Sequence, residues 1–152
     1  MRRSPSAISI LPIFLLLAAL PACGKNKASP SAAPATSAAH VQGTPHTDDA
    51  LNAWRNAGLA PEGFARIDPA PNSAAYCEHG QIRGVDTLVC EYASEEALTG
   101  GTQQVKEGWA RVDVHTGVIV RAKRTTMVVV DRERREPSGK TISQMAKIFA
   151  KL

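Results

Sequence analysis

The stretch YCEHGQIRGVDTLVCEY, from Tyr76 to Tyr92, decides the fold of this chain. Arg83-Gly84 lies at its middle, and an X-Gly pair between two apolar runs favours the two-residue turn of an antiparallel hairpin. With this turn, Cys77 falls directly opposite Cys90. The turn and the cysteines therefore select the same strand register independently, and register decides which side chains share a face.

Both faces of this predicted hairpin carry apolar side chains. One face carries Cys77, His79, Leu88, Cys90 and Tyr92, and the other carries Tyr76, Ile82, Val85 and Val89. A sheet with one solvated face alternates cleanly between apolar and polar residues. Neither face is cleanly polar here, so we expect both to be partly covered.

Helical patterns precede and follow the hairpin. Thr47-Asp48-Asp49 can cap a first helix, which we expect to stop at Gly58. Ser94 begins a second, with an apolar stripe from Leu98 to Val112 at helical spacing. Gly100-Gly101 interrupts this stripe and weakens the helix by about 1 kcal/mol per glycine, which indicates a kink or close packing on the sheet.

The remaining segments complete the predicted fold. Residues 59–71 hold three prolines and read as an irregular crossing, whereas Val118 to Asp131 reads as a second hairpin. Thr141 and Gln144 fit a capping box for a last helix. We therefore expect an α+β domain with the order helix, hairpin, helix, hairpin, helix, a four-stranded antiparallel sheet, and helices mainly on one face.

The first residues of the chain have the pattern of an export signal. Arg2 and Arg3 precede the apolar stretch Ile8 to Leu20, which is shorter than the roughly 18 residues of a membrane-spanning helix. The closing run Leu20-Pro21-Ala22-Cys23 resembles the lipobox of bacterial lipoprotein precursors. The resemblance implies cleavage before Cys23, lipidation of its thiol and acylation of the new N-terminus. An ordinary signal peptide with an incidental Cys23, and a retained signal anchor, are the alternatives.

These patterns divide the chain into three parts. Residues 1–22 form the predicted lipoprotein signal peptide, residues 23–46 the lipidated Cys23 and a tether, and residues 47–152 the globular domain. The tether is rich in Ala, Ser, Thr and Pro without apolar periodicity, so we expect it to be disordered and its His40 and His46 exposed. Gly24 fits outer-membrane sorting as known for some lipoproteins, with the domain facing the periplasm or the surface.

The net charge of +4 does not belong to the domain. Four of the 18 basic residues precede residue 47, whereas all 14 acidic residues follow it, so residues 47–152 are balanced. A nucleic-acid partner, which a high overall pI would suggest, is therefore not expected. We expect the arginines and lysines between Arg121 and Arg135 to form a solvated rim. A surface patch that binds a polyanion is the alternative. The expected partners are the membrane, through the lipid on Cys23, and an envelope protein.

The other two cysteines, Cys77 and Cys90, are expected to form a disulfide, because an exported domain matures in an oxidising compartment. Their short loop gives a stabilisation of about 3 kcal/mol in the entropic model. A redox dithiol lacks the usual C-x-x-C spacing. A metal site using Cys77, His79 and Cys90 is the sharper alternative, but nothing nearby completes a tetrahedral ligand set.

No pattern in the chain predicts catalysis. Ser138-Gly139-Lys140-Thr141 resembles the end of a phosphate-binding loop, but the first glycine of that motif is replaced by Arg134. A Ser73–His79 nucleophile-base pair can be drawn, but spacing gives no reason to choose it. We expect no cofactor, no metal and no enzyme activity, and a binding or assembly module instead. The alternative is an envelope enzyme, or a small-ligand or metal-binding protein, with an unrecognised site near His79 or His115.

Overall fold

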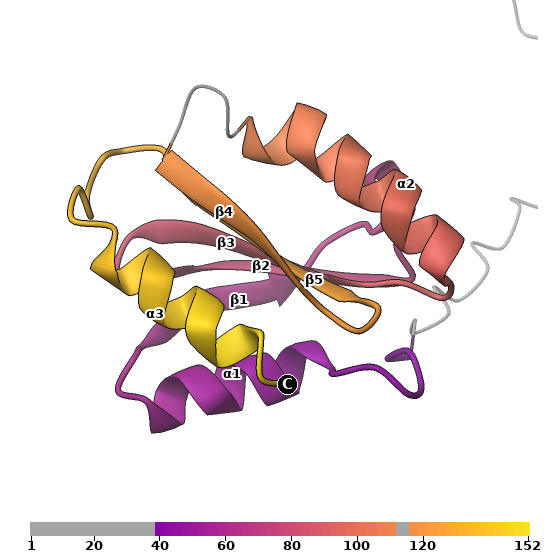
Figure 1. Ribbon diagram of the computed structural model, residues 1–152, viewed down its shortest axis with the longest axis horizontal. Coiled ribbons are helices and arrows are strands. Elements are labelled where there is room, and N and C mark those ends of the chain that lie inside the picture. Colours follow the sequence, from indigo (N-terminus) through magenta and orange to yellow (C-terminus); the bar gives the residue numbers. More distant parts are fainter. Residues whose placement is uncertain (1–38, 112–115) are drawn as a thin grey trace, which may run out of the picture. The chain divides into compact units, whose positions relative to one another are not determined.

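The computed structural model describes residues 39–111 and 116–152 (Figure 1). The predicted signal peptide, Cys23 and residues 24–38 of the predicted tether lie outside the described residues, as does His115. The elements in chain order are α1 (Thr47–Asn56), β1 (Pro61–Arg66), the 3₁₀ turn η1 (Ala70–Asn72), β2 (Tyr76–Ile82), β3 (Val85–Glu91), α2 (Glu95–Val105), the π-helical turn η2 (Lys106–Ala110), β4 (Thr116–Ala122), β5 (Thr125–Asp131) and α3 (Lys140–Phe149). No helix among these residues is long and apolar enough to cross a bilayer.

Within the described residues the sheet has five antiparallel strands in the order β1-β2-β3-β5-β4, so the prediction of four strands was wrong. The predicted order of helix, hairpin, helix, hairpin, helix was wrong as well, because a further strand lies between α1 and the first hairpin. The additional strand is β1, which lies in the stretch predicted to be an irregular crossing. It is an edge strand with mostly exposed side chains, and its pairing with β2 is interrupted by an irregularity between Glu62 and Ala65. An exposed, bulged strand carries no alternating apolar signal.

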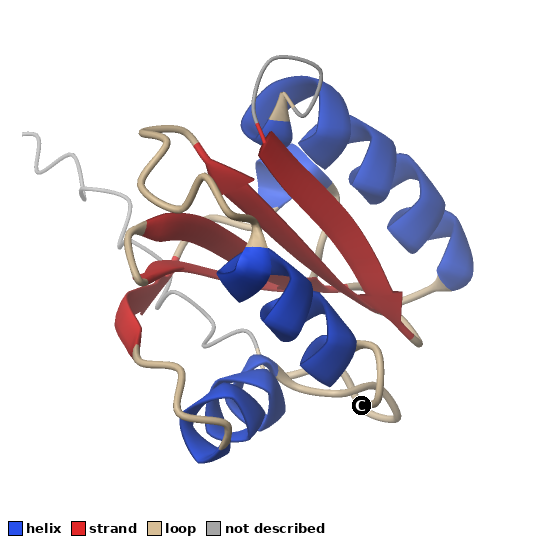
Figure 2. Cartoon of the chain, turned by 60° about the vertical axis from the view of Figure 1, so that its left-hand side comes forward, coloured by secondary structure: helices blue, strands red, loops and turns tan. Residues whose placement is uncertain are grey.

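The described helices are divided between the two faces of the sheet, two on one face and one on the other. Helices α1 and α3 pack together on one face, and α2 lies on the other (Figures 1 and 2). Trp54 of α1 and Phe149 of α3 are fully buried in the first core, and Leu98 and Val105 of α2 in the second. The apolar character of both hairpin faces, noted in the sequence, has this double coverage as its cause.

The register predicted for β2 and β3 is confirmed. Cys77 pairs with Cys90, and a disulfide joins them across the two strands. Their Cα atoms are 4.2 Å apart, which is typical of the closer, non-hydrogen-bonded kind of antiparallel pair. The carbonyl of Cys77 accepts its hydrogen bond from Ile67 on the other side of β2. Both cysteines are buried beneath α2.

The helix termini follow two of the four predicted signals. The cap predicted at Thr47 is wrong, because His46 is the N-cap of α1 and Thr47 lies inside the helix. Ser94 caps α2 by accepting the amide N–H of Ala97, and Gly58, at φ +74°, follows the end of α1. The predicted cap at Thr141 is wrong: α3 begins after Gly139, and Thr141 lies inside it. The amide of Thr141 donates to the carboxylate of Glu136, which takes the place of the expected capping box.

Two buried hydroxyl groups lie in the core beneath α2. Tyr92 Oη and Thr126 Oγ1 have no hydrogen-bond partner within the described part of the chain. Burial raises the pKa of Tyr92 to about 12 from the usual 10.0, and the neighbouring Thr126 opposes this shift weakly. A buried hydroxyl without a partner costs free energy on folding.

Replacing Tyr92 with Phe is therefore expected to raise the free energy of unfolding by about 1 kcal/mol at neutral pH. The raised pKa means that the native state keeps a proton that the unfolded chain loses above pH 10.0. Stability should thus fall as the pH rises from about 10 to 12, and less steeply in Tyr92→Phe. Urea unfolding across this pH range measures both effects. Thr126→Val is the matched control, because it removes the neighbouring hydroxyl and keeps the phenol of Tyr92. Equal slopes of stability against pH for wild type and Tyr92→Phe would contradict the prediction.

Candidate functional site

A fully buried carboxylate lies at the end of the central strand β3. Glu91 has no exposed surface, and four donors surround it. Its Oε1 accepts the amide of Thr47 at 2.9 Å and lies 2.7 Å from His40 Nδ1, and its Oε2 accepts the amide of Val41 at 2.8 Å. The Thr47 hydroxyl completes the set. These donors all come from one segment, so Glu91 binds the chain that leads into α1.

We call residues 40–47 the N-terminal strap. A second set of bonds holds its middle against the turn between β4 and β5. Thr44 Oγ1 lies 2.8 Å from Thr125 Oγ1 and accepts the amide of Arg124, whose guanidinium donates to the carbonyl of Gln42. The expectation that His40 and His46 are exposed was therefore wrong, because the described end of the predicted tether is bonded to the domain.

Stacked side chains fix the orientation of the His40 ring. His46 stacks on it at 4.6 Å between ring centroids, Tyr76 packs on it at 4.3 Å, and the Arg66 guanidinium lies over the Tyr76 ring. Burial and a hydrogen bond to Glu78 raise the pKa of the Tyr76 hydroxyl, so it remains a neutral donor. The stack holds His40 Nδ1 towards Glu91 while its Nε2 faces Asp48 at 3.9 Å.

The strap contacts form a latch rather than a catalytic dyad. A general base needs a free lone pair aimed at a reacting group. Both oxygens of Glu91 are occupied by donors of the strap, and the imidazole of His40 is covered by rings. What this arrangement does chemically is to fix the direction in which the chain enters the domain.

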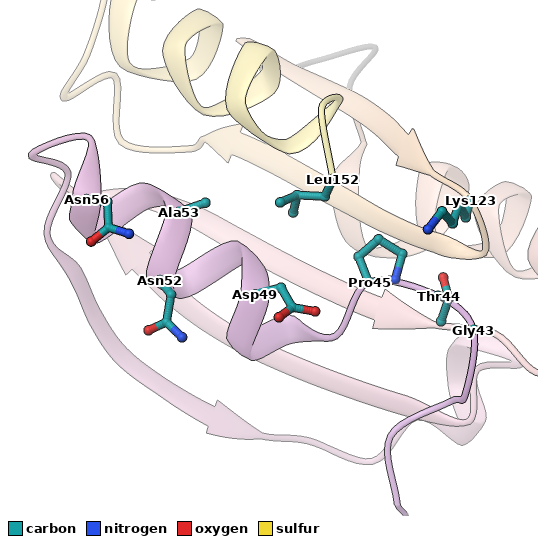
Figure 3. A pocket seen from close by; sticks show the side chains of 9 residues that line it. All are labelled: Gly43, Thr44, Pro45, Asp49, Asn52, Ala53, Asn56, Lys123 and Leu152. Atoms are coloured by element: carbon teal, nitrogen blue, oxygen red, sulfur yellow. The ribbon is translucent and has the colours of Figure 1, made fainter.

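A depression of about 550 Å³ lies beside the strap, between α1, the strap and the turn after β4 (Figure 3). Its polar side chains come from α1, from Thr44 of the strap and from Lys123. Figure 3 shows Asn52 and Asn56 spread along the helix rather than aimed at one point, with Lys123 at the far end. Binding sites for small molecules need convergent polar groups. The geometry therefore favours an open surface over a small-molecule site.

His79 lies at a second polar cluster, beneath the end of η2. Its Nε2 is 3.9 Å from Asp86, and its ring meets the edge of Trp109. Asp86 also binds Arg132, whose guanidinium covers the Trp109 ring. These side chains contact one another, so the cluster stabilises the surface at this end of the sheet. The Ser73–His79 pair that can be drawn from the sequence is not assembled, because Ser73 donates to Gln104 instead.

The alternative metal site is not formed either. Cys77 and Cys90 are joined to each other, so their thiolates are not free to bind a metal with His79. In residues 39–111 and 116–152, no three His, Cys, Asp or Glu side chains lie close enough to hold an ion. The Ser138–Thr141 segment does not resemble a phosphate site, because the Glu136 carboxylate already accepts hydrogen bonds at this helix end.

The basic run between Arg121 and Arg135 is largely balanced within the chain. Arg121 pairs with Glu95, Arg132 with Asp86 and Arg135 with Glu133, while Arg124 binds backbone carbonyls. This distribution agrees with the solvated rim and not with a single patch for a polyanion.

Glu91 is the residue that the sequence interpretation missed. Its position, an acid directly following the apolar run Leu88-Val89-Cys90, is the signal that could have identified it. Charged residues are almost never fully buried unless they are paired.

Comparison with known proteins found no similarity: no family model, no curated protein and no solved structure matches the chain.

Proposed function

We propose that the protein is a lipid-anchored, non-catalytic binding or assembly module of the bacterial cell envelope, held at the outer membrane. The single observation that carries this proposal is the run Leu20-Pro21-Ala22-Cys23 behind a basic and apolar leader. A lipid on Cys23 confines the domain to one surface, which raises its effective concentration towards any partner there.

Two features of the domain support an extracytoplasmic role. The Cys77–Cys90 disulfide suits an oxidising compartment, since such bonds are rare where thiols are kept reduced. The strap gives the tether a fixed point of attachment at Glu91 and Arg124. A pull or a constraint on the anchored end is thereby transmitted to the sheet rather than to a loose terminus.

The filled cores on both sides of the sheet favour partner binding over turnover of a small molecule. Side chains of α1 and α3 fill one face and those of α2 fill the other. The polar clusters around Glu91 and Asp86 are satisfied by groups of the chain itself. The surfaces that remain for function are therefore edges and open depressions.

Intact mass tests this proposal on protein extracted with detergent from its native membrane. We expect loss of residues 1–22, an added diacylglycerol and fatty acyl chain such as palmitate on Cys23, and a gain of two hydrogens on reduction. In Cys23→Ser, the lipid mass should disappear, while the mass change on reduction persists.

A Cys77→Ser/Cys90→Ser double variant is the reciprocal control, because it should keep the lipid and lose the response to reductant. An unmodified mass for the wild type, or a full-length chain with three free thiols, would overturn the lipoprotein proposal. Lipid attached to a chain that fractionates with the inner membrane would overturn the outer-membrane part alone.

A further inference from the structure

Strand β4 lies at the edge of the sheet, and within residues 39–111 and 116–152 one side of its backbone is unpaired. Among these residues its only partner strand is β5, which it meets over all seven of its residues and without a bulge. The opposite edge, β1, is protected by Pro61 and by its irregular pairing. Natural proteins usually blunt exposed edges with prolines, charges or bulges. The sequence TGVIVRA of β4 has a single charge and none of the other devices.

The register shows which backbone groups of β4 are free. Lys123 and Arg124 form a two-residue turn, so Ala122 and Thr125 on either side of it form a hydrogen-bonded pair. The amide of Tyr92 donates to the carbonyl of Arg124, which independently assigns the even residues of β5 to β3 and its odd residues to β4. The N–H and C=O groups of Gly117, Ile119 and Arg121 therefore point away from the sheet.

We propose that β4 pairs with β4 of a second copy of this chain, antiparallel and centred on Ile119. In this register Ile119 faces Ile119 of the second copy, and both belong to the outward-pointing set. Val118 of one copy then lies opposite Val120 of the other, with both side chains on the face of the sheet opposite to that of Ile119. Arg121 of one copy lies opposite Gly117 of the other. No like charges oppose each other, and the glycine leaves space for the arginine. The edge is thus complementary to itself in hydrogen bonding, apolarity and charge.

The surroundings of β4 fit a second copy as well. Val118, Ile119 and Val120 are only half-buried, although each packs against a core. A groove of about 540 Å³ runs between α2 and β4, lined by Thr102, Gln103, Lys106, Gly117, Val118 and Ile119. Figure 1 shows β4 passing between α2 and α3, so that an added strand would extend the sheet between the two helical layers. This inference goes beyond the proposed function, because it needs no lipid.

Cysteine cross-linking of the full chain in detergent tests the register. Paired Cα atoms of this kind lie about 5.5 Å apart, within the range that a disulfide spans. Ile119→Cys should give a reducible dimer on a non-reducing gel, with the Cys77–Cys90 bond intact by peptide mapping. Val118→Cys is the matched control, because its two copies are offset diagonally and point to the other face. It should remain uncross-linked.

The mass of the detergent-extracted protein by light scattering tests the pairing itself. Wild type should be a dimer, and Ile119→Pro should raise the dimer dissociation constant at least tenfold while keeping the hairpin, because the lost N–H faces solvent. Ile119→Lys should do the same by placing two charges face to face, and Glu62→Lys on the other edge should not. A monomeric wild type, or dimers unaffected at Ile119, would overturn the proposal. Cross-linking of Ile119→Cys to a different protein would overturn the second copy as the occupant.

Discussion

Replacing Glu91 with alanine is expected to lower the free energy of unfolding by about 4 kcal/mol. The substitution removes a fully buried acceptor that binds the amides of Val41 and Thr47 and the ring of His40. These donors would stay behind without a partner, and each buried, unpaired donor costs about 1–3 kcal/mol. The strap should therefore detach from the domain before the sheet unfolds. Denaturant unfolding measures the free energy, and hydrogen exchange at Val41 and Thr47 measures the detachment.

Two variants distinguish the loss of the hydrogen bonds between Glu91 and the strap from a general loss of negative charge. Glu91→Gln keeps the shape and one acceptor oxygen, so its loss of stability should be intermediate. Glu62→Ala removes an exposed acid from the edge strand and should change stability by less than about 0.5 kcal/mol. If Glu91→Ala unfolds within 1 kcal/mol of wild type and still protects the Val41 amide, the latch does not hold the strap.

The latch also shows the limit of what sequence pattern can predict. Residues 40–46 have the composition of a tether, and composition measures only how much apolar surface a segment can bury. The strap is held by backbone amides and short polar side chains, which bond to Glu91 and Thr125 far along the chain. Hydrogen bonds of this kind follow from position in space and leave no periodic signal. The same reason applies to β1, whose strand pairing uses its backbone while most of its side chains face solvent.

Where two independent signals coincided, the sequence was sufficient. The Arg83-Gly84 turn and the Cys77–Cys90 pair both required one register, and the structure has it. The position of α2 could not be predicted, for a different reason. Apolar residues on both hairpin faces indicated double coverage, but nothing in a helical stripe tells which face of the sheet a helix will choose. That choice depends on the connections, and α2 crosses to the face opposite α1 and α3.

The two adjacent glycines of α2, Gly100 and Gly101, differ in the space that surrounds them. A Cβ added at Gly101 would lie well inside 3.0 Å of the Asn72 backbone oxygen and the Tyr92 ring, whereas one added at Gly100 would meet nothing within 4 Å. Alanine improves helix propensity by about 1 kcal/mol at either site. Gly100→Ala should therefore stabilise the domain by about 1 kcal/mol. Gly101→Ala should destabilise it by about 3 kcal/mol, because overpacking outweighs the propensity.

The difference between the two variants isolates the contact, because both gain the same backbone term. Asn72 belongs to a turn and Tyr92 is buried beneath α2, so neither neighbour is the end of a flexible side chain that could swing away. Relief requires α2 to move off the sheet, which would also expose the Cys77–Cys90 disulfide beneath it. Faster reduction of that bond in Gly101→Ala, and not in Gly100→Ala, is the expected second readout. Equal unfolding free energies for the two variants would show that α2 does not depend on close approach at Gly101.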